Sequence, residues 1–255
     1  MCVKRVPAPG ARINITADGH DVDAAHLGFT TSPHEECAVE EAVRLTGQHG
    51  GDVTALTLGP DDAREQLRYA ASVGATHGVL VVTEETATWD PQRTAAALTE
   101  AVRTIEAGSG TFDLILFGND SADAGGVQVG VRVAHALGRP MVNAIKGIDF
   151  DADGDGGAVT ARREVDGGFE VYGLRTPCAL GVKEGLNLPR YPTMRGRLAS
   201  KKLEIRCLEP SAPAGGQRRR RLRHPAEVVG DTTILGHGPE AAPAVVDLLE
   251  ELGLP

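Results

Sequence analysis

The stretch TFDLILFGNDSADAGGVQVG, residues 111–130, joins an apolar run to a glycine-rich loop. The run Thr111–Phe117 has the β-branched and aromatic residues that are typical of a buried strand. Residues 127–137 follow the loop, and we expect them to form a helix. A strand, a loop and a helix in this order predict one unit of a parallel α/β sheet.

The same alternation occurs through the first two thirds of the chain. Strands are predicted for residues 1–6, 52–58 and 77–83, and helices for residues that begin at 33, 61 and 91. Ser32-Pro33-His34-Glu35 has the features of a helix start, because a serine cap, a proline and a capping-box carboxylate follow one another at the right spacing. The sequence therefore predicts an α/β domain with a parallel sheet over residues 1–208.

The second half of the chain has a different pattern. Residues 160–165 and 169–174 flank Asp166-Gly167-Gly168 and predict a β-hairpin, and residues 178–182 predict a further strand. Residues 183–197 are predicted to be a long loop, which serves either as an exposed docking loop or as an inward-folded lid. Residues 209–230 are predicted to be a linker, and residues 231–255 a C-terminal arm made of a strand and a helix.

Composition narrows the class of protein. The chain has 255 residues, 41% of them hydrophobic, and a net charge of −9, so we expect neither nucleic-acid binding nor membrane insertion. The basic run Arg218–Arg221 is interpreted as a solvated linker or a subunit contact. Four widely spaced cysteines favour a cytoplasmic protein without a metal site. Because no nucleophile and base are paired in the sequence, we expect no catalytic residues and no enzyme activity of its own.

Ligands of parallel sheets bind where strands end and helices begin, which directs attention to the loops after Val6, Leu58 and Phe117. Glycines in the loop Gly118–Gly130 let the backbone approach a phosphate, and the start of the next helix favours anions. From the residue types alone, the loop Gly118–Gly130 is about equally consistent with a ligand site and with an ordinary loop between a strand and a helix.

Read in order, these segments resemble the β subunit of electron transfer flavoproteins. The resemblance is carried by the following stretches: VKRVP (3–7), SPHEECAVEEAVRL (32–45), LTLGP (56–60), FDLILFGNDSADAGGVQVG (112–130), REVDGGFEV (163–171), LNLPRYPTMRGRLASKK (186–202) and ILGHGPEAAPAVVDLLEELG (234–253). It implies an adenine-nucleotide-binding, Rossmann-like fold. It also implies a heterodimer with an α subunit that holds most of the FAD site, with AMP in the β subunit and the C-terminal arm docked on the α subunit.

The resemblance further implies a role in electron transfer. Flavin-dependent dehydrogenases would deliver electrons, which would pass to a quinone oxidoreductase or another acceptor. Two alternatives stay open. One is an electron-bifurcating member with a second FAD in place of AMP. The other is a stand-alone ATP- or AMP-binding module.

The resemblance also assigns site residues by position. Those that match the nucleotide site are Cys2, Ser32, Pro33, His34, Glu35, Leu58, Gly118, Asn119, Asp120, Ser121, Ala122, Asp123, Ala124, Gly125, Gly126, Val127, Gln128, Val129 and Gly130. Those that match the docking loop are Leu188, Arg190, Tyr191, Met194 and Arg195. Val127 and Val129 stand where the family often has amide or hydroxyl side chains, so fewer side-chain donors face the nucleotide.

Overall fold

The computed structural model describes residues 1–84, 89–151, 157–210, 216–226 and 232–254. The chain divides into two units, Met1–Leu222 and Arg223–Pro255. The strands are β1 (Val6–Pro7), β2 (Phe29–Thr30), β3 (Thr54–Gly59), β4 (His77–Val82), β5 (Leu114–Gly118), β6 (Met141–Asp151), β7 (Ala158–Val165), β8 (Gly168–Arg175), β9 (Cys178–Val182) and β10 (Ile205–Leu208). The helices are α1 (Pro33–His49), α2 (Arg64–Val73), α3 (Pro91–Ser109), α4 (Val129–Ala136), α5 (Met194–Ser200) and α6 (Ala242–Glu251), with 3₁₀ turns at Asp61–Ala63 and Gly238–Ala241.

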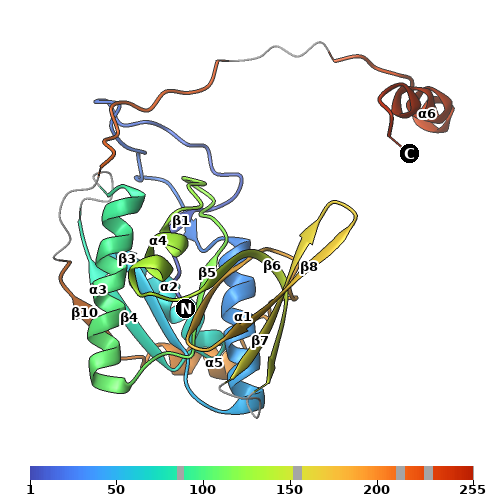
Figure 1. Ribbon diagram of the computed structural model, residues 1–255. Coiled ribbons are helices and arrows are strands. Elements are labelled where there is room, and N and C mark those ends of the chain that lie inside the picture. Colours follow the sequence, from blue (N-terminus) through green and yellow to red (C-terminus); the bar gives the residue numbers. More distant parts are fainter. Residues whose placement is uncertain (85–88, 152–156, 211–215, 227–231, 255) are drawn as a thin grey trace. The chain divides into compact units, whose positions relative to one another are not determined.

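The first unit is built on two groups of strands, which have the orders β10-β4-β3 and β5-β9-β6-β7-β8 (Figure 1). Strands β10, β4 and β3 are mutually parallel, and so are β5, β9 and the first residues of β6. Strands β7 and β8 are antiparallel and form the predicted hairpin. Cys2 joins the two groups, because it forms parallel bridges to Leu56 of β3 and to Phe117 of β5.

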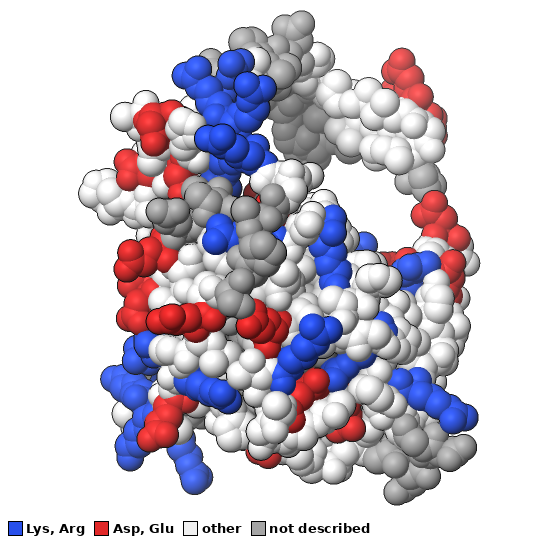
Figure 2. Space-filling view, turned by 60° about the vertical axis from the view of Figure 1, so that its left-hand side comes forward, with Lys and Arg blue, Asp and Glu red and all other residues white. Residues whose placement is uncertain are grey.

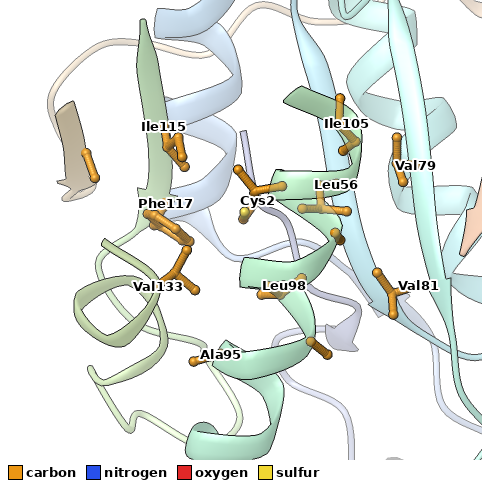
Figure 3. Close-up of a cluster of buried hydrophobic side chains, with 14 of the residues drawn as sticks. Cys2, Leu56, Val79, Val81, Ala95, Leu98, Ile105, Ile115, Phe117 and Val133 are labelled. Carbon is orange, nitrogen blue, oxygen red and sulfur yellow. The ribbon is translucent and has the colours of Figure 1, made fainter. Parts of the chain in front are cut away.

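Helices cover both faces of these strands. One apolar cluster lies between the strands and helices α3 and α4, and it includes Cys2, Leu56, Leu98, Phe117 and Val133 (Figure 3). On the other face, helices α1 and α2 bury side chains such as those of Val39 and Leu67. The result is a three-layer α/β arrangement of the Rossmann-like type, as the sequence predicted. No described helix is long and apolar enough to cross a membrane.

Four local predictions differ from the structure. Strand β6 was not predicted, because Ala144 has a φ of +58° and the register shifts between Val142 and Ile145, which interrupts the period-two pattern. Strand β10 was also missed: it is only four residues long, and its pairing with β4 depends on tertiary contacts. Within residues 1–6, the expected strand is reduced to Cys2 and to Val6, which begins β1. The predicted loop 183–197 runs into helix α5 at Met194.

In the described residues of the second unit, a 3₁₀ turn leads into helix α6. Helix α6 exposes the apolar side chains of Val245, Val246, Leu248 and Leu249, and Leu252, which caps its end, is exposed as well. The strand predicted for residues 231–235 is wrong over 232–235, which form no strand, and residue 231 lies outside the described residues. Parts of the predicted linker, 211–215 and 227–230, lie outside them as well.

Candidate functional site

The candidate site lies where the strands of the first unit end and helices α1 and α4 begin. Strand β5 ends at Gly118, and the loop from there to Gln128 leads into α4. Cys2 lies between β3 and β5, so the first residues of the chain reach the same edge (Figure 3). This is the edge at which open parallel sheets bind ligands.

Helix α1 begins at this edge with a complete capping box. The Ser32 hydroxyl accepts a hydrogen bond from the Glu35 amide at 3.3 Å, and the Glu35 carboxylate accepts one from the Ser32 amide at 3.0 Å. Glu35 is almost fully buried, and this burial raises the pKa of its carboxyl group to about 8, against the opposing hydrogen bonds from the Ser32 and Lys4 amides. Burial thus favours the neutral form of this carboxyl group at the start of α1.

Gly118 permits the close approach of α1 to the end of β5. A Cβ atom at this position would lie 2.6 Å from Cγ of Glu35 and 3.3 Å from its backbone nitrogen. Gly130 has a similar role at the start of α4, because a Cβ there would lie 2.9 Å from Cε of Met141 and 3.0 Å from Cγ of Phe117. These two glycines fix the distance between the strand end and both helices.

One ion pair and one histidine–carboxylate contact hold the glycine-rich loop in place. The Lys4 ammonium group lies 2.6 Å and 2.7 Å from the two carboxylate oxygens of Asp123. Burial acts to raise the pKa of Asp123, but the charge of Lys4 and its hydrogen bonds outweigh that effect and lower the pKa. His34 Nε2 lies 2.9 Å from Asp120 Oδ1, while His34 Nδ1 accepts a hydrogen bond from the Glu184 amide at 2.8 Å.

The last part of the loop is suited to anions. Gly125 has a φ of +53° and Val127 has a φ of +51°, so two residues with left-handed backbone precede helix α4. Helix α4 has no side-chain cap: its first residue follows Gln128, whose side chain instead accepts hydrogen bonds from Arg132 at 3.1 and 3.2 Å. Uncapped N–H groups at a helix start carry partial positive charge and bind phosphate or carboxylate.

Several predicted residues come together here. His34 and Glu35 contact the loop at Gly118 and Asp120, and Ser32 caps the helix that Pro33 begins. Asn119 is tied to β9, because its amide donates to the Val182 carbonyl at 2.8 Å. Leu58 packs against the cluster on the α3 and α4 face. Ser121, Ala122 and Ala124 lie on the outer part of the loop.

Sequence reasoning missed Lys4 and Glu184. Lys4 carries the positive charge at the end of the first strand, and its position just before the loop after Val6 was an available signal. Glu184 contributes its backbone amide, a role that side-chain chemistry could not reveal. In the described parts of the chain, no three His, Cys, Asp or Glu side chains are grouped so as to hold a metal ion.

The predicted docking loop is anchored at its base and exposed at its apolar side chains. Leu188, Tyr191 and Met194 are 92%, 91% and 73% exposed, so they do not fold inward as a lid. The Asn187 amide group donates to the Cys37 carbonyl and to Glu41, each at 2.9 Å. The loop is thereby held on helix α1 while its apolar side chains face outward.

Arg190 is part of this anchor. Its guanidinium pairs with both carboxylate oxygens of Glu40, at 2.7 and 2.8 Å. Helix α5 follows and packs on α2 so closely that a Cβ at Gly196 would lie 2.1 Å from the Ser72 carbonyl oxygen. Arg190 therefore holds the loop on α1 through a bidentate ion pair, and Arg195 stays exposed on α5.

The amino-acid sequence of this chain is similar to those of known proteins whose family agrees with a ligand site at this edge of the sheet. The family model described as "Electron transfer flavoprotein domain" matches residues 22–213, three quarters of the chain. The chain belongs to the electron transfer flavoprotein family. It is 35% identical to the electron transfer flavoprotein subunit beta of Syntrophomonas wolfei over 206 residues, which cover 80% of this chain and 77% of the relative.

Other relatives of the electron transfer flavoprotein family agree. The subunit beta of Megasphaera elsdenii is 31% identical over 84% of this chain and 78% of its own length. Protein FixA of Azorhizobium caulinodans is 31% identical over 80% of this chain and 72% of its own length. The resemblance to β subunits of electron transfer flavoproteins is thus confirmed, and with it a place among electron-transfer proteins.

Proposed function

We propose that this chain is the β subunit of a heterodimeric electron carrier and that it holds AMP at the Gly118–Gly130 loop. The observation that carries the nucleotide assignment is the uncapped start of helix α4, which follows left-handed backbone at Gly125 and Val127. This arrangement offers backbone N–H groups to a phosphate without needing hydroxyl side chains, which Val127 and Val129 lack. Cys2 and residues 32–35 then form the adenosine side of the site.

In this proposal the redox chemistry is supplied by FAD, which the α subunit holds for the most part. The residues of this chain position the bound nucleotide and shield it from water. Helix α1, the Lys4–Asp123 pair and the His34–Asp120 contact fix the loop around the nucleotide. Bound AMP stabilises the folded subunit by mass action, because it binds only the folded site.

The exposed apolar side chains of the loop support a docking role toward flavin-dependent dehydrogenases. Met194 is a flexible apolar side chain surrounded by arginines, as in an interface with an apolar anchor and a polar rim. The apolar face of α6 supports docking of the C-terminal arm on the α subunit. Electrons would pass from the dehydrogenase through the flavin to a quinone oxidoreductase or another acceptor.

The test of the nucleotide proposal is a stoichiometry. The native protein is purified with whatever binds it and denatured, and released AMP, FAD and ATP are quantified by mass spectrometry. One AMP and one FAD per heterodimer are expected. Two FAD and no AMP would replace the proposal by the bifurcating alternative, and no flavin and no flavoprotein partner would overturn it.

Gly118→Ala provides a matched test of the site. The new methyl group overlaps Glu35, so we expect a loss of bound AMP of tenfold or more, together with a lower thermal midpoint. Gly108→Ala is the control, because Gly108 lies near the end of α3, outside the loop, and its Cβ would meet no atom within 4 Å. Equal AMP content in both variants would show that the nucleotide binds elsewhere.

Met194→Ala tests the docking role. We expect the dehydrogenase to reduce the flavin about tenfold more slowly, the cost of about 1.4 kcal/mol for one lost apolar anchor, with AMP content unchanged. Val171→Ala is the control, because Val171 is equally exposed but lies on the β7–β8 hairpin. Equal reduction rates in wild type and Met194→Ala would remove the anchor role.

A further inference from the structure

Two neighbouring parallel strands bring the glycine-rich loop and the docking loop to the same edge of the sheet. Strands β5 and β9 are paired so that Gly118 lies opposite Val182. The glycine-rich loop leaves the end of β5, and the docking loop leaves the end of β9. The Asn119 amide donates to the Val182 carbonyl at 2.8 Å, so the two loops start side by side before they diverge.

The ring of His34 lies across the starts of both loops. Its Nδ1 atom accepts a hydrogen bond from the Glu184 amide at 2.8 Å, at the beginning of the docking loop. Its Nε2 atom lies 2.9 Å from Oδ1 of Asp120, in the glycine-rich loop. A Cβ atom at Gly118 would lie 3.4 Å from Cβ of His34, so the side chain also starts against the end of β5. One ring therefore contacts both loops, each through a different nitrogen.

The two nitrogens of His34 have different roles. A ring nitrogen that accepts a hydrogen bond carries no proton, so the proton of the neutral ring lies on Nε2, the nitrogen beside the Asp120 carboxylate. The ring thus has an acceptor on the side of the docking loop and an N–H group on the side of the glycine-rich loop. Because the ring is rigid, a displacement of Asp120 changes the position of the acceptor that the Glu184 amide uses.

Beyond Glu184, the docking loop follows helix α1 in a constant register. Three successive contacts each join residues that are 150 positions apart, namely His34 with Glu184, Cys37 with Asn187 and Glu40 with Arg190. Residues three apart in a helix lie on one face, so these contacts follow one face of α1. The first of the three contacts is the one that also reaches the glycine-rich loop.

We propose that His34 couples the two loops, so that a ligand that orders the glycine-rich loop also orders the start of the docking loop. A ligand that restricts the motion of Asp120 restricts the ring, and the ring then holds the Glu184 amide more firmly. Coupling of this kind is reciprocal, so a partner bound to the docking loop strengthens ligand binding by the same factor. The identity of the ligand as AMP rests on the proposed function, whereas the coupling between the loops does not.

Two conservative variants separate the two contacts of the ring. In His34→Asn, the side-chain oxygen can take the place of Nδ1 as acceptor for the Glu184 amide, but the side chain is too short to reach Asp120. In His34→Gln, the longer side chain can take the place of Nε2 beside Asp120, but the Glu184 amide loses its acceptor. Both variants keep the Cβ atom that packs at Gly118. His77→Asn is the matched control, because His77 is an exposed histidine at the start of β4.

The first test measures site-resolved amide hydrogen exchange at Glu184 in the full chain, purified with its partner, with and without saturating AMP. In the wild type and in His77→Asn, we expect AMP to slow this exchange about fivefold, near the lower end of the usual range of coupling between two sites. In His34→Asn, exchange should stay slow but should no longer respond to AMP. In His34→Gln, exchange without AMP should be about tenfold faster, because the amide has lost its hydrogen bond.

A second test perturbs the glycine-rich loop without any nucleotide. Asp120→Ala removes the carboxylate that faces Nε2. We expect it to speed exchange at Glu184 about threefold in the wild-type background and to leave that exchange unchanged in the His34→Asn background, which is the non-additivity of two residues that act through one contact. Both comparisons use the nucleotide-free protein.

The outcomes distinguish the coupling from the proposed function. If AMP slows exchange at Glu184 equally in the wild type and in His34→Asn, the two loops are coupled through the body of α1 and the role of His34 is overturned. If Asp120→Ala leaves exchange at Glu184 unchanged in the wild-type background, the coupling itself is overturned. If equilibrium dialysis shows that the wild type does not bind AMP, the AMP assignment alone fails, because the Asp120→Ala comparison still decides the coupling.

Discussion

Val127 carries backbone strain at the candidate phosphate loop. Its φ of +51° lies in the left-handed region, which costs an L-residue roughly 1–2 kcal/mol and is least compatible with a β-branched side chain. Its side chain is about half exposed, so packing does not offset the strain. Strain of this kind is often retained where backbone N–H groups must converge on a ligand.

We therefore expect Val127→Asn to stabilise the protein, because asparagine tolerates left-handed backbone. A gain of about 1 kcal/mol would raise the thermal midpoint by about 2–4 °C. Val131→Asn is the control, since Val131 is equally exposed but lies inside helix α4. If both variants have the wild-type midpoint, Val127 is not strained in solution.

Glu35 makes stability depend on pH. Burial raises its pKa to about 8 in the folded state, from 4.5 for an unperturbed glutamate side chain. The unfolded chain therefore loses this proton near pH 4.5, and the folded chain keeps it until about pH 8. The stabilising contribution is complete below pH 4.5 and is lost as the pH rises through about 8.

Glu35→Gln should remove this dependence while it keeps an acceptor for the Ser32 amide. We expect the thermal midpoint of the wild type to fall more steeply between pH 5 and pH 9 than that of the variant, by about 2 °C or more. Thermal unfolding of the wild type and of Glu35→Gln, measured at several pH values between about 5 and 9, tests this difference. Parallel profiles would mean that Glu35 is ionised in the folded protein.

At the scale of elements, one ion pair explains how an exposed loop keeps a fixed shape. Arg190 binds both carboxylate oxygens of Glu40, which is largely buried on α1. Burial acts to raise the pKa of Glu40, but the hydrogen bonds from Arg190 outweigh it and lower the pKa. The loop thus presents Leu188, Tyr191 and Met194 on a base that is anchored to helix α1.

Arg190→Ala should free the loop. We expect amide exchange at Leu188 and Tyr191 to speed up about tenfold and helix α1 to lose stability, because Glu40 is left without its partner. Arg195→Ala is the control, since Arg195 is exposed on the neighbouring helix. Unchanged exchange in Arg190→Ala would mean that Asn187 alone anchors the loop.

At the scale of the first unit, residues 216–222 connect distant parts of the candidate site edge. The Gln217 amide donates to Asp90 at 2.7 Å, at the start of α3, and the Leu222 amide donates to the Gly19 carbonyl at 2.8 Å. Arg219 pairs with Asp21 at 3.1 Å. On the face that Figure 2 shows, Lys and Arg side chains form one dense group and are elsewhere mixed with Asp and Glu, so this face does not carry charge of one sign.

We expect Arg219→Ala to speed tryptic cleavage within Arg218–Arg221 two- to fivefold, the modest effect of one exposed ion pair. Arg220→Ala removes one cleavage site as well and serves as the control. Cleavage at equal rates in both variants would show that the backbone hydrogen bonds alone hold the segment.

The sequence by itself determined strands β3, β4 and β5 together with helices α1, α2 and α3, the capping box at Ser32, the β7–β8 hairpin and the family, whereas β2 was not predicted. These features rest on local periodicity, turn chemistry and short-range hydrogen bonds, which a segment carries wherever it lies. The site residues were assigned from the matched motifs, and the structure places His34 and Glu35 against Gly118 and Asp120.

Only the tertiary structure decided the rest. Strand β10 depends on pairing with β4, and β6 depends on a bulge that breaks its own pattern. The Lys4–Asp123 pair spans 119 residues, and the Arg190–Glu40 pair spans 150. Such features arise from residues far apart in the chain, so no local pattern can specify them.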